Sequence, residues 1–373
     1  MNAGEAGATT GALACRRILV IATRQIGDVL LTTPLIRAAK VRWPEARIDV
    51  LGFAGTLGML RGNPDVSELI EVAPRSGWRG AWADMRRIWR AYDLALVTQQ
   101  SDRAHLYGWM AAPVRSGLVP VRSSTAWWKR RLLQHAVPIA GDRGDVHVVI
   151  EKLALLAPWQ AAPAATLVPP EATALPVGLT RQLGAGAVVV QVPSMWRYKQ
   201  WPLPSFRTLV DGLLADGHQV VLTGGPSEED RSKVAAIAAA GAAPQLIDVC
   251  GQLDFNQLAA LLQRAALYIG PDTSVTHLAA ACGVPVIALF GPSNPQRWGP
   301  WVEGEALQPY ERRAPRQPNS RVILLQGEAD CAPGVPCGRA GCEDHNASPS
   351  ACLESGLAPA RVLREARALL ATR

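Results

Sequence analysis

A strand–helix–strand pattern over residues 268–301 constrains the fold of this chain more than any other feature of its sequence. Residues 266–269 form a short β-rich run, residues 275–282 form a helix of small apolar side chains, and residues 284–290 form a second apolar run. Gly283, between the helix and the second run, is a typical helix terminator. Two buried strands joined through a helix make a βαβ unit, which predicts a parallel sheet.

The start of the helix in this unit carries groups that suit an anionic ligand. The first strand is expected to stop at Gly270 and Pro271. Asp272, Thr273 and Ser274 follow, with short oxygen-bearing side chains at the helix start. The crevice beyond the carboxyl ends of such strands collects exposed N–H groups and the positive end of the helix dipole. We therefore expect phosphate to bind here.

Strands and helices alternate in the same way through both halves of the chain. The expected strands are residues 17–22, 47–52, 68–72, 93–98, 187–192 and 218–223, and the expected helices are residues 28–43, 81–91, 102–112, 146–156, 203–215, 228–240 and 358–371. This alternation predicts an α/β fold with mostly parallel sheets covered on both faces. We expect two doubly wound α/β domains.

A stretch rich in alanine and proline and poor in charge, residues 157–178, separates the two halves. The expected organisation is a disordered tail at residues 1–15, an N-terminal domain at 16–165, a linker at 166–186, a C-terminal domain with a cysteine-containing loop at 187–356, and a C-terminal helix at 357–373. The last helix carries Arg361, Arg364 and Arg367 along one face. Its sequence does not indicate which domain it packs against.

The composition indicates a globular protein with large cores, because 49% of the residues are hydrophobic and 18% are charged. No apolar stretch approaches the roughly 20 residues that span a bilayer. Residues 1–15 lack the basic leader and apolar segment of a secretory signal, so we expect a cytoplasmic protein.

The net charge of +7 comes largely from arginine, which is concentrated in residues 75–131. Such a region is either a solvated basic face or a site for a phosphorylated partner or an anionic membrane surface. Residues 127–131, with the sequence WWKRR, suit peripheral contact with the cytoplasmic face of the inner membrane. Nucleic acid is not an expected partner, because the chain has no recognisable nucleic-acid module.

Four of the seven cysteines lie in one segment of the C-terminal half: Cys331, Cys337, Cys342 and Cys352. A reducing compartment disfavours a stable disulfide framework. The four thiols could hold structural zinc or iron, although their spacing does not match the usual pairs of metal-binding cysteines. The alternative is a loop whose thiols pack or stay free.

A turn with candidate catalytic groups follows the first strand. It contains Thr23, Gly27 and Asp28, and Gly27 allows a tight turn or a close backbone approach. Asp28 lies at the start of a helix at the carboxyl edge of the sheet, where it either caps the helix or acts as a general base.

Two loops of the second half carry candidate ligand-binding groups. Arg197 and Lys199 follow the strand at residues 187–192, where they could meet phosphate charge. Glu228 follows the next strand and either binds ribose hydroxyls or pairs with the helix dipole.

Taken together, these loops resemble glycosyltransferase family 9, the bacterial heptosyltransferases that build the lipopolysaccharide core. The similarity extends from Arg16 to the C-terminus. Its most specific parts are IGDVLLTTPLIRA at residues 26–38, KQWP at 199–202, GGPSEE at 224–229 and DTSVTHLAAACGVPVIALFGPSNP at 272–295. The resemblance implies the GT-B architecture, with two Rossmann-like domains facing a central cleft, and inverting transfer of heptose from ADP-heptose.

The resemblance also implies a role for each candidate residue. Asp28 becomes the general base that activates the acceptor hydroxyl, with Thr23, Gly27 and Arg197 as further contacts. Lys199 neutralises the diphosphate, Glu228 holds the ribose, Thr273 and Ser274 bind phosphate through their N–H groups, and Asp272 and His277 order that helix start. No cofactor and no metal at the reaction centre are expected, since the chain lacks an Asp-x-Asp metal motif.

Two departures from the family pattern leave alternatives open. Ser274 stands where many members have glycine, and the cysteine segment is stretched. Some protein-directed heptosyltransferases hold iron through such cysteines, so the acceptor is either the phosphorylated inner core of lipopolysaccharide (lipid A-Kdo) or a protein. A non-catalytic nucleotide-sugar-binding protein is a further alternative. A dehydrogenase is disfavoured because neither domain opens with a Gly-x-Gly-x-x-Gly loop.

Overall fold

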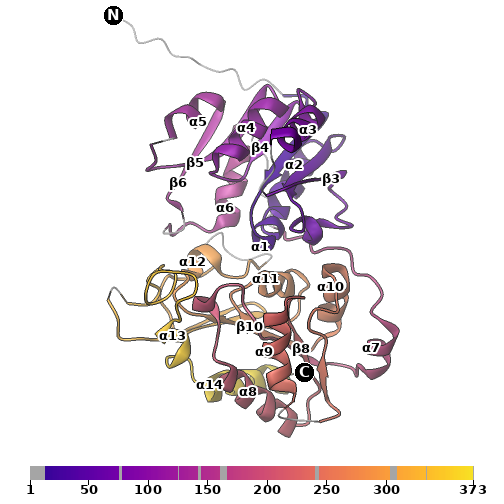
Figure 1. Ribbon diagram of the computed structural model, residues 1–373, viewed down its shortest axis with the longest axis vertical. Helices are drawn as coiled ribbons and strands as arrows, with labels where there is room; N and C mark the ends of the chain where they lie inside the picture. The colour runs from indigo at the N-terminus through magenta and orange to yellow at the C-terminus, as the bar shows by residue number, and fades with distance from the viewer. Residues whose placement is uncertain are drawn as a thin grey trace, which may run out of the picture.

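In the computed structural model the chain forms two α/β domains, with the N-terminal domain uppermost in Figure 1. The structure describes residues 13–74, 78–124, 126–141, 144–159, 166–239, 243–302, 309–332 and 334–372. Residues 1–12 of the expected tail and residues 160–165 before the linker lie outside the described residues. Residues 13–15 pack on the first domain, because Cys15 is buried and the Leu13 carbonyl accepts a hydrogen bond from Trp43 Nε1.

The N-terminal domain is built on a six-stranded parallel sheet in the order β3-β2-β1-β4-β5-β6, the strand order of a Rossmann fold. Its strands are β1 (Arg17–Ala22), β2 (Arg47–Phe53), β3 (Glu68–Val72), β4 (Leu94–Val97), β5 (Val114–Pro120) and β6 (His135–Ile139). Its helices are α1 (Ile26–Leu30), α2 (Thr33–Arg42), η1 (Leu57–Leu60), α3 (Trp78–Ile88), α4 (Asp102–Ala111), α5 (Ala126–Leu132), α6 (Val148–Leu153) and η3 (Ala154–Trp159). Apolar clusters fill both faces of the sheet, one beneath α2 and η3 and the other beneath α3 and α4.

The single helix expected over residues 28–43 is wrong, because the chain forms two helices, α1 and α2, in this region. Pro34 has no N–H group, so it cannot donate to the carbonyl of Leu30. That carbonyl accepts a hydrogen bond from the hydroxyl of Thr33 instead, and the hydroxyl of Thr32 bonds to the carbonyl of Asp28. The break keeps Asp28 on a short helix at the edge of the sheet.

The C-terminal domain contains a seven-stranded sheet in the order β12-β13-β11-β10-β7-β8-β9, and only the β12–β13 pair is antiparallel. Its strands are β7 (Val188–Gln191), β8 (Val220–Thr223), β9 (Leu246–Asp248), β10 (Leu267–Pro271), β11 (Val286–Phe290), β12 (Arg316–Asn319) and β13 (Val322–Gln326). Its helices are η4 (Arg197–Lys199), α8 (Leu203–Ala215), α9 (Glu228–Ala238), α10 (Phe255–Arg264), α11 (Ser274–Ala281), α12 (Pro295–Trp298), α13 (Ala351–Glu354) and α14 (Pro359–Ala371). Without β12, this is again the Rossmann strand order.

The strand β10 runs two residues further than expected, through Gly270 to Pro271. Its pairing with β7 ends at Ile269, whereas its pairing with β11 continues to Pro271. A proline is tolerated at a strand end because its missing donor costs no ladder hydrogen bond there. The helix α11 begins at Ser274, so Asp272 and Thr273 are the whole connection between β10 and α11.

The linker and the C-terminal helix both pack on the C-terminal domain. Residues 166–186 contain a short helix, α7 (Val177–Gln182), and Leu175 and Leu179 are buried in the domain core. The helix α14 lies against α8, where Arg367 pairs with Asp216 at 2.7 Å. Tertiary packing thus decides the question that the sequence left open.

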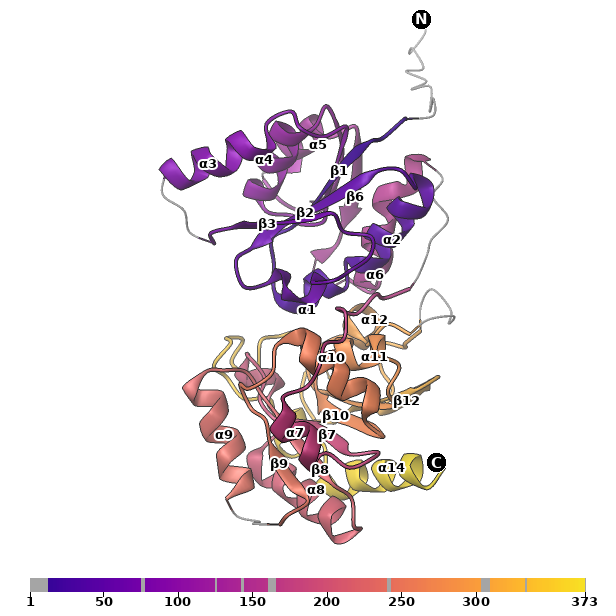
Figure 2. The same ribbon diagram turned by 90° about the vertical axis from the view of Figure 1, so that its right-hand side faces the viewer.

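The two domains share an apolar interface, which Figure 2 shows between α1 above and α10, α11 and α12 below. Leu30 and Leu31 at the end of α1 and Val148 at the start of α6 belong to the same buried cluster as Val275 and Leu278 of α11. The domains therefore bury part of their core against each other, with the carboxyl edges of both sheets at the junction.

Candidate active site

The candidate site lies where the strand order of each sheet reverses, at β1/β4 in the N-terminal domain and at β7/β10 in the C-terminal domain. Ligands of doubly wound sheets bind beyond the carboxyl ends of the strands at such points. The helices that follow β1 and β10 are α1 and α11, which pack against each other across the interface. The two predicted halves of the site thus face each other.

Gly27 lies at the contact between α1 and α11. A Cβ atom at this position would lie 3.4 Å from Cα of Ser274 and 3.7 Å from Cδ2 of His277. Gly27 therefore provides the close backbone approach that its position in the sequence suggests. The group that it approaches is the start of the helix expected to bind phosphate.

Asp28 is buried on α1, and its carboxylate lies 3.8 Å from the guanidinium of Arg24. Its carbonyl oxygen accepts hydrogen bonds from Nζ of Lys152 at 2.6 Å and from the hydroxyl of Thr32 at 2.8 Å. No side-chain hydrogen bond caps α1, so Asp28 does not act as its N-cap. The backbone of Asp28 is held in place while its carboxylate faces a narrow pocket.

That pocket has a volume of only about 20 Å³. Polar and charged side chains of both domains form much of its lining, among them Arg24, Asp28, Thr98, Gln99, Gln100, Glu151, Lys152 and Arg297. Such a volume holds about one water molecule and is too small for a sugar in this arrangement. A larger cavity of about 360 Å³ lies beside Val284 and Val322, near the amino-terminal ends of β11 and β13 and away from the candidate site.

Lys152 is a buried cation that the sequence analysis did not identify. Its ammonium group bonds to the carbonyl of Asp28 and, at 3.0 Å, to the hydroxyl of Thr32. Burial lowers the pKa of Lys152 to about 8, and the negative charge of Asp28 opposes this shift. The sequence does contain a signal for Lys152: Glu151 and Lys152 are adjacent charged residues inside the apolar run 146–156. Charged residues in a buried segment seldom occur without a partner, so this pair indicates a functional or structural contact.

Lys199 reaches the edge of β10 from the loop after β7, as the sequence analysis expected. Its ammonium group forms an ion pair of 2.6 Å with the buried carboxylate of Asp272. Burial is the largest single influence on the pKa of Lys199 and lowers it, but the charges of Asp272, Tyr198 and Asp28 and the hydrogen bond to Asp272 together outweigh burial, so the pKa lies above its ordinary value. Lys199 is therefore a fixed positive charge beside the start of α11.

The first turn of α11 keeps its N–H groups available for a ligand. Thr273 is the N-cap residue, but its side chain makes no capping hydrogen bond. Its hydroxyl instead lies 3.4 Å from that of Thr276, and Ser274 is partly exposed as the first helical residue. Uncapped N–H groups and the helix dipole together favour an anion at this position.

His277 lies one turn into α11 and is buried, and its Nδ1 atom has no hydrogen-bond partner among the described residues. Burial lowers the pKa of His277 to about 4, although the charge of Asp272 opposes the shift. The ring is therefore neutral near pH 7. A neutral imidazole with an unpaired nitrogen beside Gly27 can bind a polar group of a ligand.

The remaining predicted residues are more dispersed. Thr23 is buried at the end of β1, and its hydroxyl has no partner in the described part of the chain. Glu228 is exposed as the first residue of α9. Arg197 forms an ion pair of 2.7 Å with Glu354 of α13, so its guanidinium contacts the C-terminal part of the chain in this arrangement.

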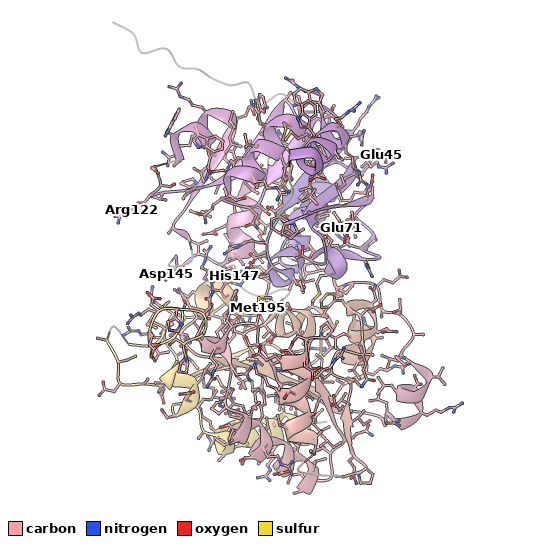
Figure 3. The ribbon with its side chains drawn as sticks, in the orientation of Figure 1. Glu45, Glu71, Arg122, Asp145, His147 and Met195 are labelled. Carbon is pink, nitrogen blue, oxygen red and sulfur yellow. The ribbon has the colours of Figure 1, made fainter. Side chains whose placement is uncertain are left out.

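A second set of buried polar residues joins the domains, and the sequence analysis missed it. Arg297 of α12 makes two hydrogen bonds to the carboxylate of Glu151 on α6, at 2.7 and 3.0 Å. His147 accepts a hydrogen bond from the N–H of Val149 and lies 2.9 Å, through Nε2, from the carbonyl oxygen of Gly299. Figure 3 shows His147 at the junction of the domains. These contacts place α6, and with it Lys152, against the C-terminal domain.

The four cysteines of the C-terminal segment are all free thiols. Burial raises the pKa of the Cys352 thiol to about 12, and the neighbouring thiols of Cys337, Cys342 and Cys331 raise it further. The thiols are thus close enough to influence one another, yet the described residues contain no group of three or more side chains arranged to hold a metal ion. A structural zinc or iron ion stays a prediction.

Comparisons with known sequences identify the family of this chain. A sequence model of glycosyltransferase family 9 (heptosyltransferase) matches residues 82–313. Lipopolysaccharide heptosyltransferase 3 of Escherichia coli is 32% identical over 291 residues, which cover 74% of this chain and 83% of that protein.

None of the described helices is both long and apolar enough to cross a membrane.

Solved structures show the same architecture. ADP-heptose lipopolysaccharide heptosyltransferase II of E. coli superposes with a TM-score of 0.70 at 21% identity, covering 95% of this chain and 99% of that one. A family 9 glycosyltransferase from Veillonella parvula gives a TM-score of 0.73 at 19% identity, with 97% and 99% coverage. The expected GT-B architecture is confirmed. The chain belongs to glycosyltransferase family 9, the heptosyltransferase family, and is a glycosyltransferase.

Proposed function

We propose that this enzyme transfers heptose from ADP-heptose to the phosphorylated inner core of lipopolysaccharide in the cytoplasm, with inversion at the anomeric carbon. The observation that carries the proposal is the position of Asp28 opposite the uncapped start of α11, across the Gly27–Ser274 contact. A carboxylate and an anion-binding helix start lie on opposite sides of one junction. The names of the similar heptosyltransferases support the sugar and the acceptor class.

In the proposed reaction the carboxylate of Asp28 accepts the proton of an acceptor hydroxyl. The hydroxyl oxygen attacks the anomeric carbon of the heptose, and the bond from that carbon to the ADP oxygen breaks. ADP leaves with the electron pair of that bond. Lys152 and Thr32 hold the backbone carbonyl oxygen of Asp28 by hydrogen bonds, so the backbone stays in place while the carboxylate accepts the proton.

The leaving diphosphate requires positive charge and N–H donors, which α11 and Lys199 supply in this proposal. The first turn of α11 provides N–H groups of Thr273 and Ser274 and the positive end of its dipole. Asp272 keeps Lys199 protonated beside them. Glu228, exposed after β8, is in the adjoining strand–helix turn and is proposed to hold the ribose.

In this proposal the described arrangement, with a pocket of only about 20 Å³ beside Asp28, is the closed form of the enzyme. Substrate entry would require the domains to separate at the interface that Glu151 and Arg297 join. Closure then excludes water from the reaction and places the acceptor against the donor.

The test replaces Asp28 with Asn, which keeps the size of the side chain but removes its basicity. Loss of a general base should lower kcat by about a hundredfold to ten-thousandfold, measured as ADP release. Thermal stabilisation by ADP, compared with UDP and GDP, should be retained. Wild-type turnover by Asp28→Asn would contradict the assignment of the base.

The same assays separate the alternatives. Binding of ADP without turnover on any core acceptor would favour a nucleotide-sugar-binding protein. Transfer to a polypeptide but not to lipid A-Kdo acceptors would favour a protein-directed enzyme.

A further inference from the structure

An unusual set of large apolar side chains is exposed on α3, on the turn directly after it, and on the neighbouring helices α4 and α5 of the N-terminal domain. The residues of this tryptophan face and their exposed fractions are Trp82 (60%), Trp89 (55%), Leu106 (46%), Trp109 (43%) and Trp127 (64%). Both views place the three helices together in the part of the domain that lies away from the C-terminal domain (Figures 1 and 2). Scattered exposed apolar residues are common, but four exposed indoles on or beside adjacent helices indicate an interaction surface.

Some of these side chains contact one another. Trp82 lies on α3, which ends at Ile88, and Trp89 lies in the turn directly after that helix. Trp89 then meets Trp109 of α4 edge to face, with ring centroids 6.4 Å apart. The guanidinium of Arg131 lies 6.0 Å above the ring of Trp127 on α5. Trp89 and Trp109 therefore form one continuous patch, and Trp127 lies with Arg131 on the neighbouring helix α5.

The charged residues around the tryptophan face are mainly basic. Exposed arginines on or beside the three helices are Arg86, Arg87, Arg90, Arg122, Arg130 and Arg131. The acidic residues nearby are already paired, since Asp84 lies 3.8 Å from Arg103 and Asp102 lies 2.7 Å from the buried Lys129. Of these arginines, Arg87 pairs with Glu68, and no ion pair to a described residue is recorded for Arg130 or Arg131.

We propose that the tryptophan face binds an anionic lipid bilayer, with its indoles in the interfacial layer and its arginines against lipid phosphate. Indole and guanidinium groups are both favoured at the boundary between headgroups and acyl chains. A second copy of the chain fits less well, because a twofold contact would bring the same arginines together. The proposal rests on the chemistry of this surface and not on the identity of the acceptor.

The sheet topology connects this surface to the candidate site. The helices α3, α4 and α5 follow β3, β4 and β5 in a parallel sheet, so the loops that lead into them leave the edge that carries Asp28. The starts of α3, α4 and α5 are therefore the part of this surface nearest to Asp28, whereas the rest of it lies away from the C-terminal domain. A bilayer bound along these helices would leave the C-terminal domain free to move.

The test is sedimentation of the full-length protein with vesicles. We expect binding to vesicles of phosphatidylethanolamine and phosphatidylglycerol that weakens as salt is added, and much weaker binding to vesicles of phosphatidylcholine alone. Replacing Arg130 and Arg131 with Ala should reduce binding to the anionic vesicles about fivefold for each charge removed. Failure of the wild-type protein to bind the anionic vesicles would overturn the proposal.

The variant Trp82→Gln/Trp127→Gln tests the apolar part of the surface. Each indole would bury on the order of 100 Å², so partitioning should fall at least about tenfold for each side chain. The matched control is Val177→Gln/Arg181→Ala on α7, which removes an exposed apolar and an exposed basic side chain from the other domain and should bind as the wild type does.

Two further readouts keep the outcome unambiguous. Lipids brominated near the headgroup should quench tryptophan fluorescence in the wild type and less in the Trp82/Trp127 variant. Turnover with a short soluble acceptor should be unchanged in that variant, so loss of lipid binding is distinguishable from loss of the proposed activity. Equal loss of binding in the α7 control would contradict the proposal, as would self-association that the tryptophan replacements abolish while vesicle binding persists.

Discussion

The ion pair between Glu151 and Arg297 should contribute substantially to the stability of the interface between the two domains. Replacing Glu151 with Gln tests this. Both side chains are almost fully buried, Arg297 at 2% exposure and Glu151 at 6%. The two hydrogen bonds between them join α6 to α12 across residues that are 146 positions apart in the chain. Glu151→Gln removes the negative charge and leaves the guanidinium buried without a counter-charge.

The expected loss follows from the burial of the pair. Removing one partner of a buried ion pair costs about 3–5 kcal/mol, and Gln should give the lower end because its carbonyl oxygen still accepts one hydrogen bond. The entropy of unfolding is about 2.1 cal/mol/K per residue, so a loss of 3 kcal/mol corresponds to roughly 4 °C in Tm if both domains unfold together. Differential scanning calorimetry would measure this change, and a split into two transitions would show that the domains have separated.

The double variant Glu151→Leu/Arg297→Met is the informative control. Replacing both partners with apolar residues of similar size removes the uncompensated charge, so most of the lost stability should return. Asp216→Asn on the exposed Arg367–Asp216 pair serves as a matched comparison and should change Tm little, because solvent screens that pair. A wild-type Tm for Glu151→Gln, or an equal decrease for Asp216→Asn, would refute the reasoning.

Two further changes probe the junction itself. Gly27→Ala should fold and bind ADP, because its Cβ would make ordinary contacts of 3.4 and 3.5 Å with Ser274. Gly27→Val should lower kcat at least about tenfold, because the larger side chain would force α1 away from α11. Equal kcat for the two variants would contradict this expectation. Acid should destabilise the interface, because burial lowers the pKa of His277 to about 4 and that of His147 to about 3, below the ordinary 6.5. The folded protein therefore binds fewer protons than the unfolded chain below pH 6.5, so stability is complete above pH 6.5 and falls as the pH decreases toward 4, by on the order of 3 kcal/mol for His277. Urea unfolding of the wild type and of His277→Gln at a series of pH values would measure this, and identical pH dependence of the two proteins would exclude His277 as a cause.

Much of the fold is predictable because hydrophobic periodicity is a local property of the chain. The bounds of β1, β3 and α8 agree with those expected from the sequence, since each has a clear apolar pattern between turn residues. The expected helix at residues 28–43 is wrong because Pro34 cannot donate to the carbonyl of Leu30 and the hydroxyls of Thr32 and Thr33 bond to backbone carbonyls instead. Apolar periodicity does not contain these effects.

The sequence by itself determined the alternating strands and helices, the loops at the carboxyl ends of the strands, and hence the placement of Asp28, Lys199 and Asp272 at sheet edges. Only the tertiary structure decided that Gly27 faces Ser274, that Lys152 supports the backbone of Asp28, and that Arg297 pairs with Glu151. These contacts join residues more than a hundred positions apart, and Arg297 meets Glu151 only when the two domains pack together. Local patterns therefore specify each half of the site, whereas the interface energy that aligns the halves comes from the assembled fold.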